Sequence, residues 1–258
     1  MESKIICFSN QKGGVGKSTS CINISAILGS EGYKVLVIDM DPQANTTSGL
    51  GVDDKKTARN IYHCIVNDSA FDTQTIIKTD FKNVDIVPSD IVLANAELEL
   101  AAAMGRECIL KDIIKRSDLQ SYDYILIDLP PNLGLLTVNG LVAADKVIIP
   151  VDVSVFALAG VSQLVSVIKT VKRKLNPGLE ILGAVLTKVD SRTNLSKEIY
   201  TLISDIFKNK LFKSVIHQSI KIAESQKEQK PLIYFDAKCN SSKEYIALTI
   251  EVLLSIKS

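Results

Sequence analysis

The chain of 258 residues has no tryptophan, and aromatic residues make up 5% of it. Proteins that bind single-stranded nucleic acids stack bases on aromatic rings set in a basic groove, so this scarcity disfavours that class. The five cysteines include no Cys-x-x-Cys pair and no metal-ligand spacing. An odd, scattered set of thiols is typical of a protein in a reducing cytosol.

Long uninterrupted apolar runs are also missing. The longest apolar stretch, around residues 141–168, contains Asp145, Lys146, Pro150 and Asp152. A membrane-spanning helix needs about 20 predominantly apolar residues, so we expect none here. The first strand is predicted to begin almost at the N-terminus, which leaves no room for a signal peptide. These features predict a soluble, cytoplasmic protein.

Neither sign of charge dominates, because 30 basic residues stand against 29 acidic ones. Their distribution is uneven. Residues 1–150 hold 14 Lys and Arg against 19 Asp and Glu, a net charge of −5, whereas residues 151–258 hold 16 against 10, a net charge of +6. A basic C-terminal half has two explanations, an electrostatic footprint for nucleic acid or an ordinary lysine-rich surface, and charge alone does not separate them.

What the chain has in quantity is apolar, β-branched runs that alternate with helical patterns. Continuous apolar strands such as residues 124–127 suit a parallel sheet covered on both faces. We therefore predict the α/β class, with one doubly wound domain over residues 1–258 and a mostly parallel sheet flanked by helices. The predicted strands are 4–9, 34–39, 84–87, 123–128, 146–150, 180–187 and 212–216, and the predicted helices are 17–30, 107–116, 134–143, 158–174, 194–207 and 241–256.

Some polar and aromatic residues carry weaker signals. Residues 40–75, rich in Asp, Asn, Thr and Ser, predict the most irregular region, either a loop that responds to nucleotide or an ordinary surface loop. His63 and His217 have no partner His or Cys at metal-ligand spacing, so we expect structural roles for both. The aromatic residues of the C-terminal half that we expect in the core are Tyr200, Phe207 and Phe212.

The most informative segment is Lys12-Gly13-Gly14-Val15-Gly16-Lys17-Ser18-Thr19, which follows an apolar run and precedes a helical pattern. A strand, a glycine-rich loop and a helix in this order form a phosphate loop, in which backbone N–H groups and the helix N-terminus surround phosphate oxygens. Lys17 is placed to reach the β- and γ-phosphates, and the Ser18 hydroxyl is placed to bind Mg²⁺. The segment predicts a nucleoside triphosphate site.

Acidic residues follow two predicted strands. Asp39 and Asp41 come at the end of one, and Asp128 ends another. The carboxyl ends of parallel strands meet at the edge of the sheet where ligands bind, and Asp128 there fits a metal-holding role. Asp39 and Asp41 flank one residue, so on an extended backbone they point the same way, one toward the Mg²⁺ shell and the other toward the attacking water. A single strand-end aspartate is often only a turn former, yet three after a phosphate loop favour a site.

These segments resemble the ParA/Soj-type partition ATPases of the MinD/ParA superfamily, over residues 4–250. The phosphate loop is similar to the deviant Walker A motif of that superfamily, because Gln11 replaces the first glycine of the ordinary pattern and Lys12 adds a second lysine. The Walker A′ and Walker B matches are Asp39-Met40-Asp41-Pro42-Gln43-Ala44-Asn45 and Ile127-Asp128-Leu129-Pro130-Pro131. Further typical segments are Ser48-Gly49-Leu50-Gly51, Leu133-Gly134-Leu135-Leu136-Thr137 and Arg192-Thr193-Asn194-Leu195.

The resemblance implies an ATPase that uses ATP and Mg²⁺ and forms a nucleotide-sandwich homodimer. Lys12 then reaches the partner subunit's phosphates, and Asp41 positions the water for hydrolysis. The implied catalytic residues are Lys12, Lys17 and Asp41, the nucleotide-binding residues are Lys12, Gly13, Gly14, Val15, Gly16, Lys17, Ser18 and Thr19, and the metal-binding residues are Ser18, Asp39 and Asp128.

The resemblance also implies that the ATP-bound dimer binds double-stranded DNA without sequence preference, with Arg192 and Lys221 among its DNA contacts. A ParB-like partner then stimulates slow hydrolysis, and cycles of binding to the nucleoid move chromosome or plasmid DNA. A basic surface fits this expectation, because phosphate contacts by Lys and Arg give affinity without base reading.

The chain departs from the family pattern in two places. The family commonly shows a Pro-Arg-Asn segment near the adenine site, where this chain has His217-Gln218-Ser219. The side-chain contacts to the base and one DNA-binding arginine therefore differ from the pattern. The first strand begins near Lys4, with no helix-turn-helix extension before it, so we do not expect operator-specific autoregulation.

Three rival functions follow from related proteins. A MinD-like regulator ends in a basic amphipathic tail that enters the membrane surface, whereas residues 245–258 have few basic residues and predict a core-packing helix. A metallocluster protein needs thiolate ligands after the Walker B segment, where this chain has only Cys239. We therefore expect neither a membrane partner nor a metal cluster. ParA-like positioning of a protein cargo on the nucleoid stays open.

Overall fold

The computed structural model describes residues 3–53, 57–154, 157–190, 192 and 194–257. Its centre is an eight-stranded sheet in the order β3-β4-β2-β5-β1-β6-β7-β8. Neighbouring strands are parallel except for β3, which pairs antiparallel with β4 at one edge. The strands are β1 (Lys4–Phe8), β2 (Val35–Asp39), β3 (Ile77–Lys78), β4 (Val84–Val87), β5 (Tyr124–Asp128), β6 (Lys146–Asp152), β7 (Glu180–Val189) and β8 (Leu211–His217).

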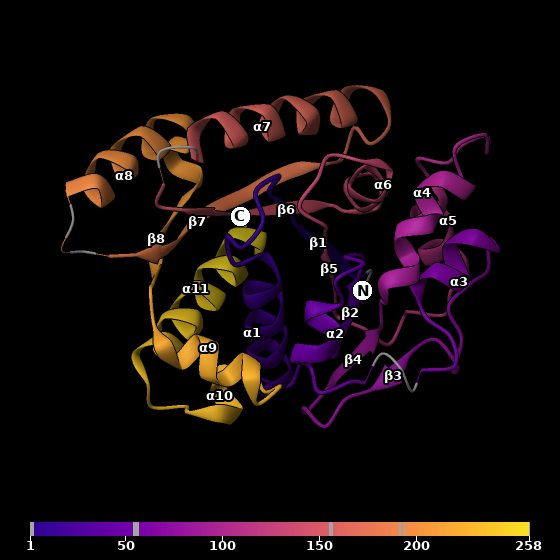
Figure 1. The fold of residues 1–258 in the computed structure, drawn as a ribbon, viewed down its shortest axis with the longest axis horizontal. Coiled ribbons are helices and arrows are strands. Elements are labelled where there is room, and N and C mark those ends of the chain that lie inside the picture. Colours follow the sequence, from indigo (N-terminus) through magenta and orange to yellow (C-terminus); the bar gives the residue numbers. More distant parts are fainter. Residues whose placement is uncertain (1–2, 54–56, 155–156, 191, 193, 258) are drawn as a thin grey trace.

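Helices cover both faces of the sheet, each over its own hydrophobic core (Figure 1). The helices of one face are α3 (Ile61–Val66), α4 (Ala96–Glu99), α5 (Ile109–Arg116), α6 (Leu135–Ala143), α7 (Ala157–Lys174) and α8 (Asn194–Phe207). The helices over the second core are α1 (Lys17–Ser30), α10 (Leu232–Phe235) and α11 (Asn240–Lys257). The predicted doubly wound α/β fold with a mostly parallel sheet is confirmed.

The predicted strands and helices are all present, with ends displaced by no more than one or two residues. Residues 40–75 are less irregular than predicted, because α2 (Asn45–Gly49) and α3 lie within them. The sequence pattern also missed β3 and the short helices α4, α9 (Ile220–Lys227) and α10. Elements of two to eight residues are too short to show a clear hydrophobic period. In the described part of the chain, short 3₁₀ helices also lie at Ile91–Asn95 and Lys208–Lys210.

Helix α1 is enclosed by protein along most of its length, and its residues 19–29 are all buried. Its buried polar side chains bond to backbone groups or to side chains of other helices. Asn23 donates to the Thr19 carbonyl (2.8 Å) and accepts from the backbone N–H of Leu232 (2.8 Å), which ties α1 to α10. A helix that is buried all round is held firmly on every side. The start of α1, where the phosphate loop ends, is therefore well fixed.

Strand β8 forms an edge of the sheet, and side chains of α11 occupy part of its exposed backbone. Glu251 accepts hydrogen bonds from the backbone N–H groups of Lys213 and Ser214 (2.8 Å each), and Glu244 accepts one from that of His217 (3.0 Å). Free edge N–H groups invite pairing with other chains. These two carboxylates remove three such donors from the edge.

The predicted core-packing role of the C-terminal helix holds for one of its faces only. Tyr245, Leu248 and Val252 of α11 are buried, whereas Ile250 and Leu254 are 53% and 64% exposed on the outer side. Within the described ranges, every helix is too short or too polar to serve as a membrane span.

Of the aromatic residues expected in the core, Phe207 and Phe212 are buried, but Tyr200 is 45% exposed. That expectation was wrong for Tyr200, because Ile199 beside it takes the buried face of α8. The structural role expected for His63 is confirmed, since its side chain completes a capping box at the start of α3.

Candidate nucleotide-binding site

The phosphate loop joins β1 to α1 with an unusual backbone. Gly14 (φ 72°) and Gly16 (φ 89°) both adopt the left-handed conformation, which glycine reaches without steric cost. Gly16 begins α1 without a side-chain cap. The first N–H groups of a helix have no partner within the helix, and the helix dipole adds positive potential there. The start of α1 is therefore an anion-binding site of the predicted kind.

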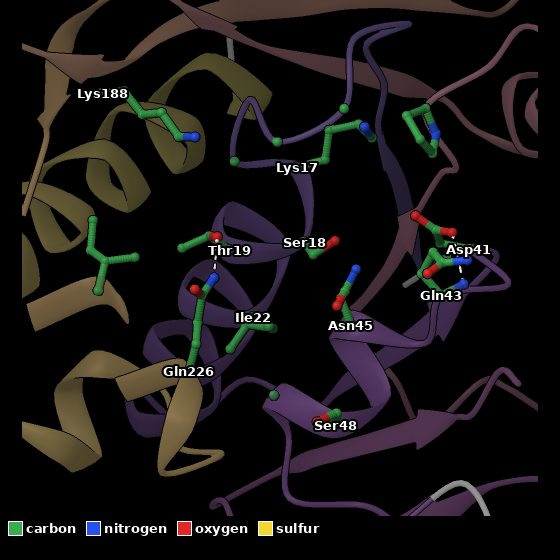
Figure 2. Close-up of a pocket in the computed structure, with 16 residues that line it drawn as sticks. Lys17, Ser18, Thr19, Ile22, Asp41, Gln43, Asn45, Ser48, Lys188 and Gln226 are labelled. Atoms are coloured by element: carbon green, nitrogen blue, oxygen red, sulfur yellow. Dashed lines mark hydrogen bonds between the residues drawn. The ribbon is translucent and has the colours of Figure 1, made fainter. Parts of the chain in front are cut away.

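A cavity of about 530 Å³ lies against this loop (Figure 2). The predicted nucleotide-binding residues that line it are Gly13, Gly14, Gly16, Lys17, Ser18 and Thr19. Lys12 and Val15 are not part of its lining. Val15 is buried under the loop, where its carbonyl oxygen accepts a hydrogen bond from the Thr187 hydroxyl (2.8 Å).

Lys17 is a nearly buried cation, 5% exposed, at the floor of the cavity. Its Nζ donates to the carbonyl oxygen of Lys12 (3.3 Å). Burial lowers the pKa of Lys17, because the ammonium loses water, while the negative charges of Asp128 and Asp41 oppose this shift. The ammonium thus lies between acidic side chains and a cavity of the right shape for phosphates.

Asp39 and Asp128 are brought together by strand register. They are directly opposite each other on the neighbouring strands β2 and β5, and both are fully buried. Burial raises the pKa of both carboxyls, and the charge of Asp128 raises that of Asp39 further. Interactions with Ser18, Thr46 and Lys17 act the other way on Asp128. Two carboxylates in such a place repel each other, and a nearby cation relieves that repulsion.

Ser18 and Asp128 are the residues that fit Mg²⁺. One oxygen of Asp128 accepts from the Thr46 hydroxyl (2.7 Å), whereas its other oxygen, Oδ1, is buried and has no hydrogen-bond partner in the described part of the chain. A buried carboxylate oxygen without a partner needs a cation or water. Carboxylate and hydroxyl oxygens suit a hard cation such as Mg²⁺.

Asp39 has a different task from Asp128. Its carboxylate accepts hydrogen bonds from the backbone N–H of Thr47 (2.8 Å), the Thr47 hydroxyl (2.7 Å) and the backbone N–H of Asp41 (3.1 Å). It therefore holds the segment between β2 and α2 in place. A direct metal contact by Asp39 stays a prediction.

Asp39 and Asp41 differ in what their side chains contact, and the expectation that they point the same way stays a prediction. Strand β2 ends at Asp39, so the extended alternation does not continue to Asp41. Asp41 lies in a turn, where its Oδ1 accepts from the backbone N–H of Gln43 (3.0 Å), and it lines the cavity while Asp39 does not (Figure 2). Asp41 is therefore the one of these two acids that lines the cavity, and its role toward a nucleotide stays a prediction.

The additional lysine, Lys12, turns away from its own cavity. Its Nζ bonds to Asp152 (2.5 Å) and to the Ser154 hydroxyl (2.8 Å), at and just beyond the end of β6. Its backbone N–H donates to the side chain of Asn10 (3.0 Å), which in turn donates to the Pro150 carbonyl (2.7 Å). The first part of the loop is thus fastened to β6.

Comparison with known proteins places the chain in a family. A family model described as an AAA domain matches residues 3–181. The chain is 42% identical to the sporulation initiation inhibitor protein Soj of Bacillus subtilis, over 96% of this chain and 98% of that protein. It is 40% identical to the chromosome partitioning protein ParA of Myxococcus xanthus, over 97% of this chain and 88% of that protein. The chain belongs to the ParA/Soj family of P-loop ATPases.

A solved structure supports the same fold for this ParA/Soj-type ATPase. Cobyrinic acid a,c-diamide synthase from Mycobacterium smegmatis, with bound ATP analog and magnesium, has a TM-score of 0.86 and 31% identity. The match covers 100% of this chain and 97% of that one. This match, family membership and the loop geometry together identify ATP and Mg²⁺ as the cofactors of this site.

Sequence reasoning missed the far side of the cavity in this ParA/Soj-type ATPase. Lys188 from β7 and Ile222 and Gln226 from α9 line it there. Gln226 donates to the Thr19 hydroxyl (2.9 Å), which links α9 to the start of α1. No motif marks these residues, because each comes singly from an element far along the chain. A lysine beside the end of a predicted strand, at 188, was the one available signal.

The predicted DNA-binding residues are exposed but already paired. The Arg192 side chain is 88% exposed and makes two hydrogen bonds with Asp190 (2.9 and 2.7 Å). Lys221, at the start of α9, pairs with Glu224 (3.0 Å). Thr193, in the same family-typical segment as Arg192, lies outside the described residues. DNA contact by these residues stays a prediction.

Two further observations concern the C-terminal half. His217 keeps a structural role as expected, since its ring nitrogen Nδ1 bonds to Glu244 (2.8 Å). Two lysines of this half, Lys172 and Lys210, act together with Lys146 on Glu180, at the amino ends of β6 and β7. That is the edge of the sheet opposite the phosphate loop.

Proposed function

We propose that this ATPase is an ATP-dependent dimer that binds DNA and segregates chromosome or plasmid DNA with a ParB-like partner. The position of Lys12 is the observation that supports dimerisation. Its ammonium is held outward by Asp152 and Ser154 and does not line its own cavity. A lysine of the phosphate loop that does not serve its own nucleotide is suited to serve the nucleotide of a second subunit.

Hydrolysis in this proposal is phosphoryl transfer to water, in which charge stabilisation and positioning do most of the catalysis. Ser18 and Asp128 would hold Mg²⁺, which when bound would neutralise negative charge at the phosphates. Lys17 contacts the β- and γ-phosphates from below, and Asp41 orients the attacking water from the cavity wall. Lys12 of the second subunit adds positive charge. Because one part of the site arrives only on dimerisation, hydrolysis by the isolated chain is slow, and a ParB-like partner accelerates it.

The proposed DNA contact uses exposed basic side chains on the ATP-bound dimer. Arg192 projects beyond the end of β7 with its guanidinium in solvent, and Lys221 lies on the surface of α9. In DNA binding, phosphates compete with Asp190 and Glu224 for these cations. Contacts of this kind give affinity without base reading and fall with salt. The protein is then cytoplasmic and associated with the nucleoid, and residues 1–258 act as one ATPase domain.

Dimerisation is tested with the Lys12→Ala variant. We expect the natural chain to sediment as a dimer with ATP and Mg²⁺ and as a monomer with ADP, whereas Lys12→Ala stays a monomer with either nucleotide. The control is Lys34→Ala, an exposed lysine distant from the loop in sequence. An unchanged ATP-dependent dimer of Lys12→Ala would disprove the proposed contact between subunits.

DNA binding is tested with random-sequence duplex DNA in a fluorescence anisotropy series at several salt concentrations. The proposal requires binding with ATP and little or none with ADP or without nucleotide. Arg192→Glu weakens this binding about tenfold or more and lowers the salt slope, while ATP binding is retained. Arg116→Glu is the matched control, because Arg116 is also an exposed arginine paired with an aspartate, Asp68. Equal affinity of the Arg192 variant and the natural chain places the DNA surface elsewhere.

A further inference from the structure

Lys188 has a strained backbone next to the nucleotide cavity. It is the last residue but one of β7, and its φ of 54° lies in the left-handed region. The pairing of β7 with β8 shifts register between Leu186 and Val189, on either side of it. A non-glycine residue adopts this conformation at an energetic cost that the surrounding fold must offset, and such residues cluster at functional sites.

The strained conformation places the side chain of Lys188 over the phosphate loop. Its Nζ lies 3.8 Å from the position that a Cβ on Gly14 would occupy, and the side chain lines the cavity. Figure 2 shows it extending toward the loop from β7. The preceding residue, Thr187, is buried and bonded to the carbonyl of Val15 (2.8 Å), so the end of β7 is fastened to the loop. The backbone that carries Lys188 is thus fixed beside the loop.

The ammonium of Lys188 is available for a ligand. The other two lysines of the site are engaged, Lys17 beside Asp128 and Asp41, and Lys12 on Asp152. Lys188 has no hydrogen-bond or ion-pair partner among the described residues. An exposed ammonium over the rim of an anion-binding loop attracts a phosphate group.

The ends of the cavity indicate which part of the nucleotide Lys188 meets. Asp41 marks the end of the cavity where water attacks the γ-phosphate, and Lys188 lies at the opposite end (Figure 2). Gln226 also lies away from Asp41 (Figure 2), and the apolar Ile222 from the same helix, α9, lines the cavity too. An apolar surface with a few polar groups suits the ribose and the base.

We propose that Lys188 is a nucleotide-binding residue of this ATPase, with its ammonium on the α-phosphate or ribose and its aliphatic stem against the base. It acts on the part of the nucleotide that ATP and ADP share. It therefore contributes to affinity for both and not to the chemical step. This inference rests on ATP binding alone, so it stands or falls separately from dimerisation and DNA binding.

The test is the Lys188→Met variant, which keeps an unbranched stem and removes the charge. Isothermal titration with ATP and with ADP, in the presence of Mg²⁺ and without DNA, should show about tenfold weaker binding of both nucleotides. The KM for ATP should rise in parallel, with kcat within twofold. Lys188→Arg, which keeps the charge, should recover most of the affinity. Lys227→Met is the control, since Lys227 is exposed on α9 and does not line the cavity.

A second variant separates binding from backbone structure. Lys188→Gly removes the left-handed strain, so its melting temperature without nucleotide should equal or exceed that of the natural chain, while nucleotide binding falls as in Lys188→Met. The proposal is overturned if Lys188→Met binds both nucleotides within twofold of the natural chain. Loss of ATP affinity without loss of ADP affinity would instead place Lys188 at the γ-phosphate, and a lower melting temperature of Lys188→Met would indicate a structural role.

Discussion

The two ends of the nucleotide cavity are built in different ways. The phosphate end is made by residues of one loop, among them Gly13, Gly14, Gly16 and Lys17, with Asp41 as a further lining residue. The opposite end is made by single side chains, Lys188, Ile222 and Gln226, from β7 and α9. The links between the two ends span 172 positions, from Val15 to Thr187, and 207 positions, from Thr19 to Gln226. The end that is built from one loop is visible in the sequence as a motif. The end that is built from single side chains of distant elements can be seen only in the folded structure.

The two ends also differ in burial and charge. Lys17 is 5% exposed, and Asp39 and Asp128 are fully buried, so the phosphate end concentrates charges away from water. Lys188 is exposed at the other end. Charge interactions strengthen as water is excluded. We therefore expect the largest mutational effects at the phosphate end and smaller ones opposite.

The largest effect is expected for Lys17→Ala. Removing a nearly buried ammonium that contacts the β- and γ-phosphates should weaken ATP binding about 100-fold, or by about 3 kcal/mol. Isothermal titration measures it, with Lys34→Ala as the exposed control. If Lys17→Ala loses no more affinity than Lys188→Met, the two ends contribute equally and the comparison fails.

Asp41→Ala should affect hydrolysis of ATP but not the binding of ATP at the phosphate end. Loss of the group that orients water should slow single-turnover phosphate release about 100-fold, while ATP affinity stays within about twofold. The variant should accumulate in the ATP-bound form. Asp118→Ala, at an exposed acid outside the cavity, serves as the control. Hydrolysis at the natural rate would remove Asp41 from the mechanism.

Thr187→Val tests the bond that joins the two ends. The substitution keeps the shape and leaves the buried Val15 carbonyl without its donor, so it should lower the free energy of unfolding by about 1–2 kcal/mol. Urea denaturation measures this. Thr170→Val is the matched control, because its hydroxyl also donates to a carbonyl, that of Ser166, but at an exposed site. An equal loss of unfolding free energy in both variants would mean that the hydrogen bond between Thr187 and Val15 does not contribute to stability.

The smallest effect is expected for Gln226→Ala. It removes the hydrogen bond to Thr19 and part of the cavity wall, so ATP and ADP should each bind about two- to fivefold more weakly. Competition with a fluorescent nucleotide measures both, and Gln120→Ala, an exposed glutamine elsewhere, is the control. A loss as large as that of Lys17→Ala would show that the side-chain-built end dominates.

Much of the fold could be predicted because its central strands and long helices have strong patterns. Strands such as β5, buried on both faces, are continuous apolar runs, and α7 and α8 are long amphipathic helices. The prediction failed for α2, α3 and α9, which are too short to show a clear period; side-chain caps stabilise α3 and α9 but not α2. At Tyr200 it failed because an aromatic residue was assigned to the core without regard to the face of α8.

In the site, the sequence placed Asp39 and Asp128 at the same edge, and strand register confirms it. It could not show which of Asp39 and Asp41 lines the cavity, because the surroundings of a side chain beyond a strand end depend on the turn that follows. It also could not show that Lys12 lies on Asp152, since that contact joins residues 140 positions apart.

By itself, the sequence determined the family, the α/β class and the phosphate loop, because these depend on contiguous residues whose backbone conformation and period are local properties. Only the tertiary structure decided which carboxylate faces the cavity, where Lys12 is held and that Lys188 overhangs the loop. Those facts arise when strands that are distant in sequence become neighbours and Lys188, at a shift of register between two of them, comes to lie beside the phosphate loop. The phosphate end of this site therefore follows from local backbone conformation, whereas the opposite end forms only when the elements pack together.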